Sequence, residues 1–302
     1  MNTLATKKLL GVAVTAALGL GVAGNAQAAP YAYAVAENFV ENFLINLGPN
    51  ATLINAATVS ESSATRFGSG VANANATDAL HSFLGATNPG ENQGPIGQAG
   101  DYERGDAQII NANVLTGGSA WNIAESYTLL DTLGTGFGAN TLTGEVVVTG
   151  SETIGFSFDA RPFMEVEVGS DALSPPSFAT AELSFSITMV DQGTGLPVYS
   201  WAPDGFSNNG GSGSDVEPDD VEANLNDGIT ANAGQHDHQN HAGTLFSYSD
   251  FILLNQGNYN LTIAMTERVA QTAVPEPATL LLLGAGLAGL GYTRRQRKLT
   301  MA

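Results

Sequence analysis

The chain has 302 residues, with 29 acidic residues against 10 basic ones, a net charge of −19, and no cysteine. This length allows one large domain or two small ones. The acidic balance excludes a protein that binds nucleic-acid phosphates, and the lack of cysteine excludes disulfides and thiolate-bound metals. The hydrophobic fraction of 43% is too high for a wholly disordered chain, so we expect a buried core.

The charge is concentrated in the middle of the chain. Residues 29–274 hold 28 of the acidic residues and only four basic ones, a net charge of −24, and they contain no lysine. A phosphate-binding loop, a Schiff base or a general base that needs lysine is therefore excluded from this part. The six remaining basic residues lie near the two ends.

Residues 1–28 follow the pattern of a secretory signal peptide. Lys7 and Lys8 give a positive start, residues 9–23 are apolar, and Ala26 and Ala28 are the small residues that signal peptidase accepts. We expect this segment to form a signal helix that is removed by signal peptidase. The mature chain would begin near Ala29, and the protein would be exported.

The first half of the body is predicted to contain strands at residues 31–47, 108–115 and 121–130. The first of these is also compatible with a helix, because Val35, Phe39, Phe43 and Leu47 recur every four residues. Alternation of Tyr31, Tyr33 and Val35 with alanines favours a strand. Residues 85–105 are rich in Gly, Pro and Asn and indicate a loop.

From residue 142 onward, β-branched and aromatic residues alternate with polar ones, which predicts strands with one buried face. The expected strands are 142–149, 153–159, 163–168, 179–190, 196–201, 245–254 and 259–269. Their short length and the turn residues between them favour an all-β fold, an antiparallel β-sandwich of Greek-key or jelly-roll type. We expect residues 29–273 to form this single domain, flanked by the signal helix and a C-terminal hydrophobic helix.

Two glycine motifs resemble the dinucleotide-binding fingerprint G-x-G-x-x-G. Residues 284–289 match it fully, but the chain ends 13 residues later, before the required acidic residue could follow. Residues 134–139 match it in part and lead into a predicted strand instead of a helix. We reject nucleotide binding for both.

Residues 203–243 form a long acidic segment that we predict to be a loop. Within it, five carboxylates fall in eight residues, and clustered carboxylates can supply the hard oxygen ligands of calcium. These are Asp215, Glu217, Asp219, Asp220 and Glu222. The spacing does not match an EF-hand, and a solvated, self-repelling loop explains the same residues. We expect no bound cofactor, with calcium at this run as the alternative.

Three of the four histidines, His236, His238 and His241, lie within six residues of each other. Imidazoles this close could bind a transition metal such as zinc, copper or nickel. The alternative is a set of exposed polar histidines, because metal sites are usually built on rigid elements. We expect adventitious metal affinity here and no catalysis.

No catalytic motif is found in the body. The chain has no G-x-S-x-G nucleophile motif and no cysteine, so we expect a protein that is not an enzyme. Glu165 and Glu167 share one face of a predicted strand and could act as paired carboxylates of a glycoside hydrolase, although a solvated face explains them better. Trp121 and Trp201 could stack on sugars, but core packing is the more common role.

Residues 274–302 have three parts. Val274, Pro275, Glu276 and Pro277 form a stiff extended motif, residues 278–292 are uncharged, and a basic cluster follows at Arg294, Arg295, Arg297 and Lys298. As a helix, the uncharged run would span about 22 Å, which is short of the roughly 30 Å hydrocarbon core. We expect it to hold the precursor at the inner membrane only transiently, with the basic cluster on the cytoplasmic side.

This tail resembles the PEP-CTERM sorting signal of Gram-negative bacteria that produce exopolysaccharide. The resemblance implies recognition by exosortase, a membrane-embedded enzyme that cuts at this signal and passes the protein outward. It also implies that Pro275, Glu276 and Pro277 are recognised as substrate residues. It covers only the last 29 residues and implies nothing direct about the body.

We therefore expect an exported protein of the cell surface or extracellular matrix, with a structural or adhesive role in a biofilm. Exopolysaccharide is the expected partner beyond signal peptidase and exosortase. Two alternatives stay open, a calcium-dependent carbohydrate-binding module and a secreted hydrolase.

Overall fold

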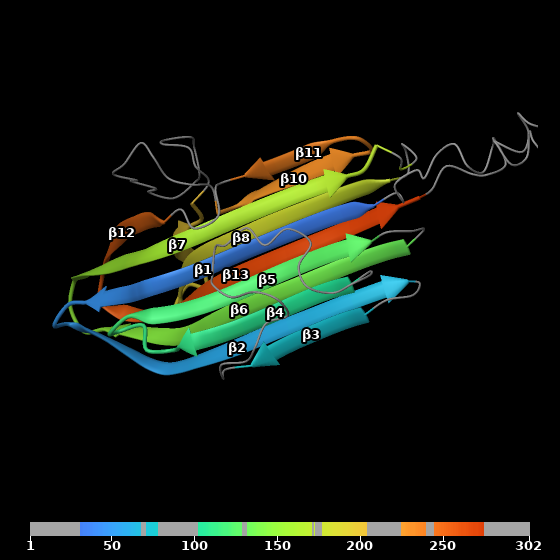
Figure 1. Cartoon of the computed structure of the whole chain (residues 1–302). Helices are drawn as coiled ribbons and strands as arrows, with labels where there is room; N and C mark the ends of the chain where they lie inside the picture. Colours follow the sequence, from blue (N-terminus) through green and yellow to red (C-terminus); the bar gives the residue numbers. More distant parts are fainter. Residues whose placement is uncertain are drawn as a thin grey trace, which may run out of the picture.

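The computed structural model describes residues 31–67, 71–77, 102–128, 132–170, 172, 177–203, 225–239 and 245–274. In these residues the prediction of an all-β fold is confirmed: two sheets pack face to face as a sandwich (Figure 1). All strand pairs are antiparallel except β3 with β4. The flanking helices expected in 1–28 and 278–292 are not borne out, because the described residues contain no helix and both segments lie outside them.

The first sheet, sheet A, has the strand order β11-β7-β1-β5-β4-β3, and β12 also pairs with β7. Its strands are β1 (Ala32–Leu47), β3 (Val71–Thr77), β4 (Tyr102–Asn111), β5 (Gly118–Thr128), β7 (Glu152–Val168), β11 (His236–Gln239) and β12 (Phe246–Leu254). Strands β12 and β11 pair with successive parts of β7 and together form one margin of the sheet.

The second sheet, sheet B, has the order β10-β8-β13-β6-β2, and β9 also pairs with β8. Its strands are β2 (Ala51–Phe67), β6 (Thr132–Val148), β8 (Phe178–Asp191), β9 (Pro197–Trp201), β10 (Asp227–Asn232) and β13 (Gly257–Ala273). The last strand of the chain, β13, is thus the central strand of sheet B. It pairs with β6 on one side and with β8 on the other.

Strand β1 contains a bulge that explains its ambiguous sequence pattern. Before the bulge, Ala32, Ala34 and Ala36 face sheet B, and after it Phe43 and Ile45 do. The register shifts between Val40 and Phe43, where Asn42 has a φ of 55°. Asparagine tolerates this left-handed conformation better than most residues. The repeat of apolar residues every four positions therefore arises because the inward-facing positions change from even-numbered to odd-numbered residues at the bulge. The preference for a strand at 31–47 is confirmed.

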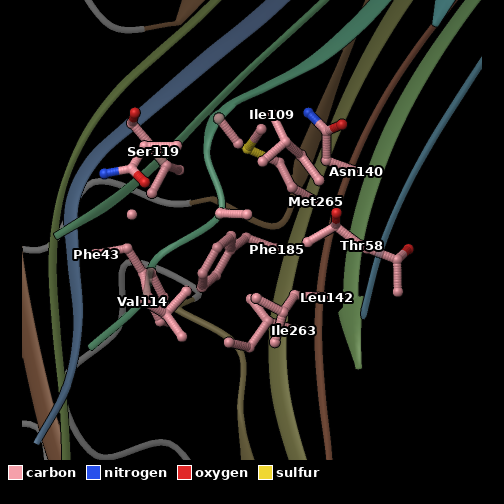
Figure 2. A pocket seen from close by; sticks show the side chains of 16 residues that line it. Phe43, Thr58, Ile109, Val114, Ser119, Asn140, Leu142, Phe185, Ile263 and Met265 are labelled. Atoms are coloured by element: carbon pink, nitrogen blue, oxygen red, sulfur yellow. The ribbon is translucent and has the colours of Figure 1, made fainter. Parts of the chain in front are cut away.

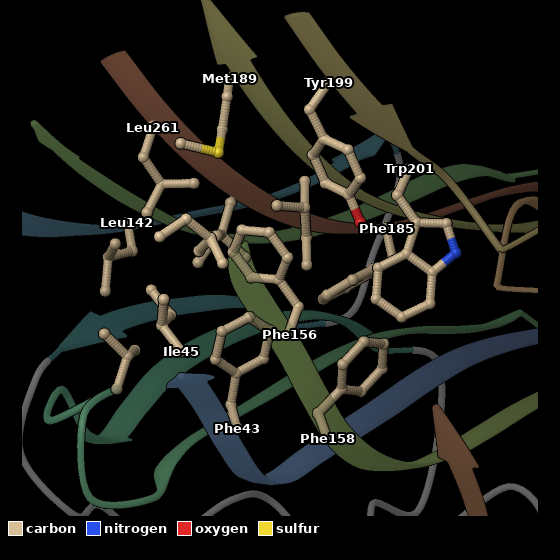
Figure 3. Close-up of a cluster of buried hydrophobic side chains, with 14 of the residues drawn as sticks. Phe43, Ile45, Leu142, Phe156, Phe158, Phe185, Met189, Tyr199, Trp201 and Leu261 are labelled. Atoms are coloured by element: carbon tan, nitrogen blue, oxygen red, sulfur yellow. The ribbon is translucent and has the colours of Figure 1, made fainter. Parts of the chain in front are cut away.

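Large aromatic side chains fill one part of the space between the sheets (Figure 3). Phe158 lies at their centre, with ring centroids 4.6 Å from Phe185, 4.7 Å from Tyr248 and 5.5 Å from Trp201. Each buried ring of this size removes a large apolar area from water. Trp201 and Trp121 are both buried, so the more common role of core packing applies to them.

Small residues fill another part of the core. Alanines of β1, together with Met164 and Val166 of the neighbouring strand β7, face Ala179 and Ala181 of β8. Between β4 and β6 the backbones of the two sheets approach each other closely, because glycines supply the contact surface. A Cβ atom at Gly136 would lie 2.2 Å from the Arg104 carbonyl oxygen, and one at Gly105 would lie 2.3 Å from the Phe137 carbonyl oxygen. The glycine motif at 134–139 thus serves packing between the sheets.

Several strands were not predicted from the sequence. Strands β2 and β3 and the first half of β6 were missed, and the break predicted between 159 and 163 is absent because β7 is continuous. The long loop predicted at 203–243 is wrong for residues 227–239, which form β10 and β11. The loop predicted at 85–105 is wrong for residues 102–105, which begin β4. These strands are short of apolar residues, so their pattern did not stand out.

A buried carboxylate lies on the inner face of β13. Glu267 is fully buried, and its cross-strand neighbours are Gly138 and Leu183. Burial away from water raises the pKa of Glu267 well above its ordinary value, and the negative charge of Glu37 raises this pKa further, whereas the amide of Asn122 partly offsets the rise. The folded state therefore binds this proton more tightly than the unfolded chain does.

We predict that Glu267→Gln raises the free energy of unfolding at neutral pH. The folded pKa lies above the unfolded one, near 4.3, so wild-type stability is fullest below that value and falls as the pH rises toward the folded pKa. Each unit of difference costs about 1.4 kcal/mol. Urea unfolding from pH 4 to 8 should show a flatter profile for the variant, and an unchanged pH slope would contradict the prediction.

We also predict that Gly138→Ala destabilises the sandwich by roughly 1–3 kcal/mol, which lowers the melting temperature by several degrees. The added Cβ would lie 2.4 Å from the Asp106 carbonyl oxygen, a backbone atom that cannot rotate away. Gly150→Ala is the matched control, because its Cβ would approach no atom closer than 3.7 Å. Equal melting temperatures for the two variants would show that the sheets are farther apart.

Candidate functional site

Most of the predicted site residues lie outside the described residues. These are Ala26, Ala28, the five carboxylates Asp215, Glu217, Asp219, Asp220 and Glu222, His241, and all of the sorting tail after Val274. No helix in the described ranges is both long and apolar enough to cross a membrane. His236, His238, Glu165, Glu167 and Val274 can be placed.

The residues that bracket the acidic run meet at one point of the sandwich. The backbone N–H of Leu225 donates to the Pro203 carbonyl oxygen at 3.0 Å, and the Asn226 side chain donates to the same oxygen at 2.9 Å. Leu225 is fully buried in the aromatic part of the core. Pro203 and Leu225, which flank the stretch that contains the five carboxylates, are therefore held next to each other.

His236 and His238 lie on β11, beside β7 of sheet A. Their ring centroids are 5.8 Å apart, and His236 Nε2 lies 2.9 Å from Glu165 Oε1. Among the described side chains, including these, no group of three His, Cys, Asp or Glu residues is placed so that it could hold a metal ion. Of the histidines predicted to bind a transition metal, the structure places only His236 and His238, which lie beside Glu165. His241 lies outside the described residues.

Glu165 and Glu167 share the outer face of sheet A, the face turned away from sheet B. The hydroxyl of Tyr31 donates a short hydrogen bond to Glu167, and His236 contacts Glu165. Burial and the Glu167 carboxylate raise the pKa of Tyr31 to about 12. Both glutamates are only partly exposed, so they are engaged by neighbours and are not a freely solvated pair.

A polar network that the sequence did not reveal occupies the same face. The hydroxyls of Tyr102 and Tyr33 donate to Glu125 at 2.6 and 3.3 Å, and Arg104 lies 3.6 Å from this carboxylate. The Arg104 Nε also donates to Asp106 at 2.6 Å. Burial raises the pKa of Glu125, while Arg104 and the tyrosine hydroxyls partly offset that rise. All five residues are at most 5% exposed, so this network stabilises the sheet internally.

An apolar cavity of about 60 Å³ lies between the sheets near the turn that follows β4 (Figure 2). Phe43, Val114, Leu142, Phe185 and Ile263 line it. Its volume is far below the roughly 300–1,000 Å³ of ligand pockets. We regard it as a packing defect of the core.

An open groove on the outer face of sheet A is large enough for a ligand, with a volume of about 350 Å³. Gly155 leaves its floor open, because the strand carries no side chain there between Asn46 of β1 and Phe251 of β12. The next row across the three strands is Leu44, Ser157 and Ser249.

Phe251 forms one wall of this groove and is 62% exposed, which is unusual for an aromatic side chain. Its neighbour Asp250 points inward instead, where the Tyr199 hydroxyl donates to it at 2.7 Å. The Phe251 N–H donates to Asp250 Oδ1 at 2.7 Å. Burial raises the pKa of Asp250, and these two hydrogen bonds partly offset the rise. The hydrogen bond from Tyr199 to Asp250 thus joins the edge strand β12 of sheet A to β9 of sheet B.

The groove could have been suspected from the strand pattern. In β12, Phe246 and Tyr248 alternate with Ser247 and Ser249, which sets the outer face as polar. Phe251 and Leu253 then fall on the outer face, and both are more than 60% exposed. Apolar residues at positions where the pattern demands polar ones are a signal for a contact surface.

The start of the sorting tail is integrated into sheet B. Ala273, the last residue of β13, is fully buried, and the Val274 N–H donates to Ser177 Oγ at 2.9 Å. Ser177 is itself 1% exposed and precedes β8. The tail therefore leaves the sandwich directly from its central strand.

Comparison with known families identifies this tail. The model of the PEP-CTERM protein-sorting motif matches residues 273–298. No similar curated protein and no similar solved structure was found for the chain. The predicted sorting signal is confirmed, and it marks an exported protein that exosortase processes at the membrane. The match begins at Ala273, inside β13, so the signal and the folded domain overlap.

Proposed function

We propose that this protein is a structural and adhesive component of the cell surface or extracellular matrix that binds a neutral exopolysaccharide through the groove at Gly155. The observation that carries the proposal is the exposed ring of Phe251 beside an open floor lined by small polar groups. The sorting motif supports the location, because it directs the chain out of the cell.

The chemistry of the groove suits a sugar. A hexopyranose presents an apolar face of C–H groups, which packs on an aromatic ring, and a rim of hydroxyls, which need hydrogen-bonding partners. Phe251 supplies the ring. Ser157, Ser249 and Asn46 supply hydroxyl and amide groups within the two adjacent rows. The open floor at Gly155 gives the chain of sugars room to approach the backbone.

The charges of the groove favour a neutral ligand. Of the described residues that line it, none is basic, and the single acid, Asp250, is engaged by Tyr199. An anionic polysaccharide would meet no positive partner there and would be repelled by a body of net charge −24. A neutral glycan avoids this repulsion.

The two alternatives make different demands on the chain. A calcium-dependent carbohydrate-binding module would use the carboxylates at 215–222 and would lose glycan binding in the presence of a chelator. A secreted hydrolase would use Glu165 and Glu167, and its activity on polysaccharides would disappear in Glu165→Gln or Glu167→Gln. Binding that persists with chelator, without turnover, supports the proposed function over both.

We predict that Phe251→Ala weakens binding on an array of neutral oligosaccharides about tenfold or more, because loss of the ring contact removes about 1.4 kcal/mol or more. Gly155→Val should abolish binding by filling the floor. The added Cβ would meet only Asn46 at 3.5 Å and the Asp250 carbonyl oxygen at 4.0 Å, so it fits without displacing the backbone.

Val59→Ala is the matched control for the array. Val59 is 53% exposed and lies on sheet B, away from the groove. Melting temperatures of all three variants would separate lost binding from lost folding. Wild-type affinity in Phe251→Ala and Gly155→Val would refute the groove as the binding site.

The sorting step can be tested independently of any ligand. Replacement of Pro275, Glu276 and Pro277 by alanine should leave the protein in the inner-membrane fraction, because exosortase would no longer recognise the motif. Cell fractionation with mass spectrometry of both mature ends measures this, and Gln296→Ala serves as a control in the same tail. Unchanged release of the alanine variant would contradict exosortase sorting.

A further inference from the structure

The end of the sandwich where the tail leaves carries an exposed apolar pair. Phe67, the last residue of β2, is 65% exposed, and Leu133 of β6 is 38% exposed. They are direct cross-strand partners, and Leu133 lies opposite Thr272 of β13. The tips of β2 and β13 lie at the same end of the molecule (Figure 1). The apolar pair therefore lies level with the point where the sorting tail begins.

The connection from this end to the hydrophobic run is short. Four residues, 274–277, separate Ala273 from the start of the uncharged run at Ala278. Four residues span at most about 14 Å when fully extended. The first of them, Val274, is held by buried Ser177, which shortens the usable reach further. The polar headgroup layer on one side of a bilayer takes up about 5–8 Å of that distance.

The described strands at this end of sheet B also lack charged residues on their outer face in the two rows nearest the end. The outermost row across the sheet is Phe67, Leu133, Thr272, Phe178 and Asn232, and the next is Thr65, Thr135, Ala270, Thr180 and Thr230. Neither row contains an acidic residue, although the body has a net charge of −24. Charged residues first appear in the third row, at Arg268 and Glu182. These two rows can approach lipid headgroups without the repulsion that acidic residues in them would cause.

We propose that this rim of the sandwich, with Phe67 and Leu133 at its centre, docks on the outer surface of the membrane while the hydrophobic run holds the precursor there. The inference rests on the proposed sorting route. The connection of residues 274–277 is short and is hydrogen-bonded to Ser177 at its start, so it keeps the rim within reach of the lipid. Phe67 and Leu133 then enter the headgroup region, as apolar interfacial residues do. Ser177 is a positioning residue in this arrangement, because it fixes where the connection starts.

The test uses the full-length chain reconstituted into phosphatidylcholine vesicles whose acyl chains carry bromine, which quenches tryptophan fluorescence at short range. Phe67→Trp places a reporter at the rim. Val59→Trp is the matched control, because both positions lie on the same face of β2 and are exposed, at 65% and 53%. Eight residues of strand separate them by about 27 Å. The wild-type signal of buried Trp121 and Trp201 is subtracted.

We expect quenching and a blue-shifted emission for Phe67→Trp and neither for Val59→Trp. Insertion of a twenty-residue Gly/Ser segment after Val274 should remove most of the quenching, because a long tether no longer holds the rim at the lipid. Equal quenching at the two positions, no quenching at Phe67→Trp, or quenching that survives the insertion would each overturn the proposal.

Flotation of the same vesicles separates this inference from the function on which it rests. Precursor that floats with the vesicles but shows no quenching at Phe67→Trp would refute the docked rim alone. Precursor that fails to float would refute the membrane stage of the sorting route and the docked rim together.

Discussion

The distance between the two sheets is the constraint on which the rest of the structure depends. Interleaved aromatic rings around Phe158 set this distance in one part of the core, and alanines and glycines set a smaller one between β1 and β8 and between β4 and β6. The distance between the sheets follows the volume of the side chains packed between them. At Gly136 and Gly105 there is no side chain, and a single added methyl group would collide with backbone atoms of the opposite sheet. The same narrow region buries Glu267 and keeps its carboxyl group away from water.

The position of β13 links folding to sorting. Strand β13 is the last strand in the sequence but the central strand of sheet B, so sheet B cannot form completely before β13 is synthesised. The match to the sorting motif starts at the last residue of this strand. The segment matched by the sorting-motif model therefore begins within the sandwich. The clamp between Ser177 and Val274 is local, but it joins the beginning of β8 to the end of β13 and so depends on both strands being in place.

The sequence predicted the parts of the structure that follow a simple period or a linear motif. Alternating apolar residues located β8 and β13, and the sorting motif was readable because its recognition is encoded in consecutive residues. Strand β2 was missed because Thr, Ser and Ala fill most of it and its exposure leaves little apolar contrast. The pattern of β12 could indicate a contact surface at Phe251, but the floor and the opposite wall of the groove could not be derived, because Asn46, Gly155 and Phe251 come together only through the register of three strands. Ser177 gave no signal, since a serine before a strand is ordinary.

The central place of β13 has a mechanical consequence. A force applied at the C-terminal end of β13 would pull this strand along its own axis, against ladders with β6 over Gly257–Ala273 and with β8 over Tyr259–Thr272. In that shear geometry the hydrogen bonds of both ladders bear the load together, whereas a strand peeled from an edge would lose them one at a time. Forced unfolding is governed by the unfolding rate, so such a domain would withstand a pull on its C-terminal end for longer than its equilibrium stability alone indicates.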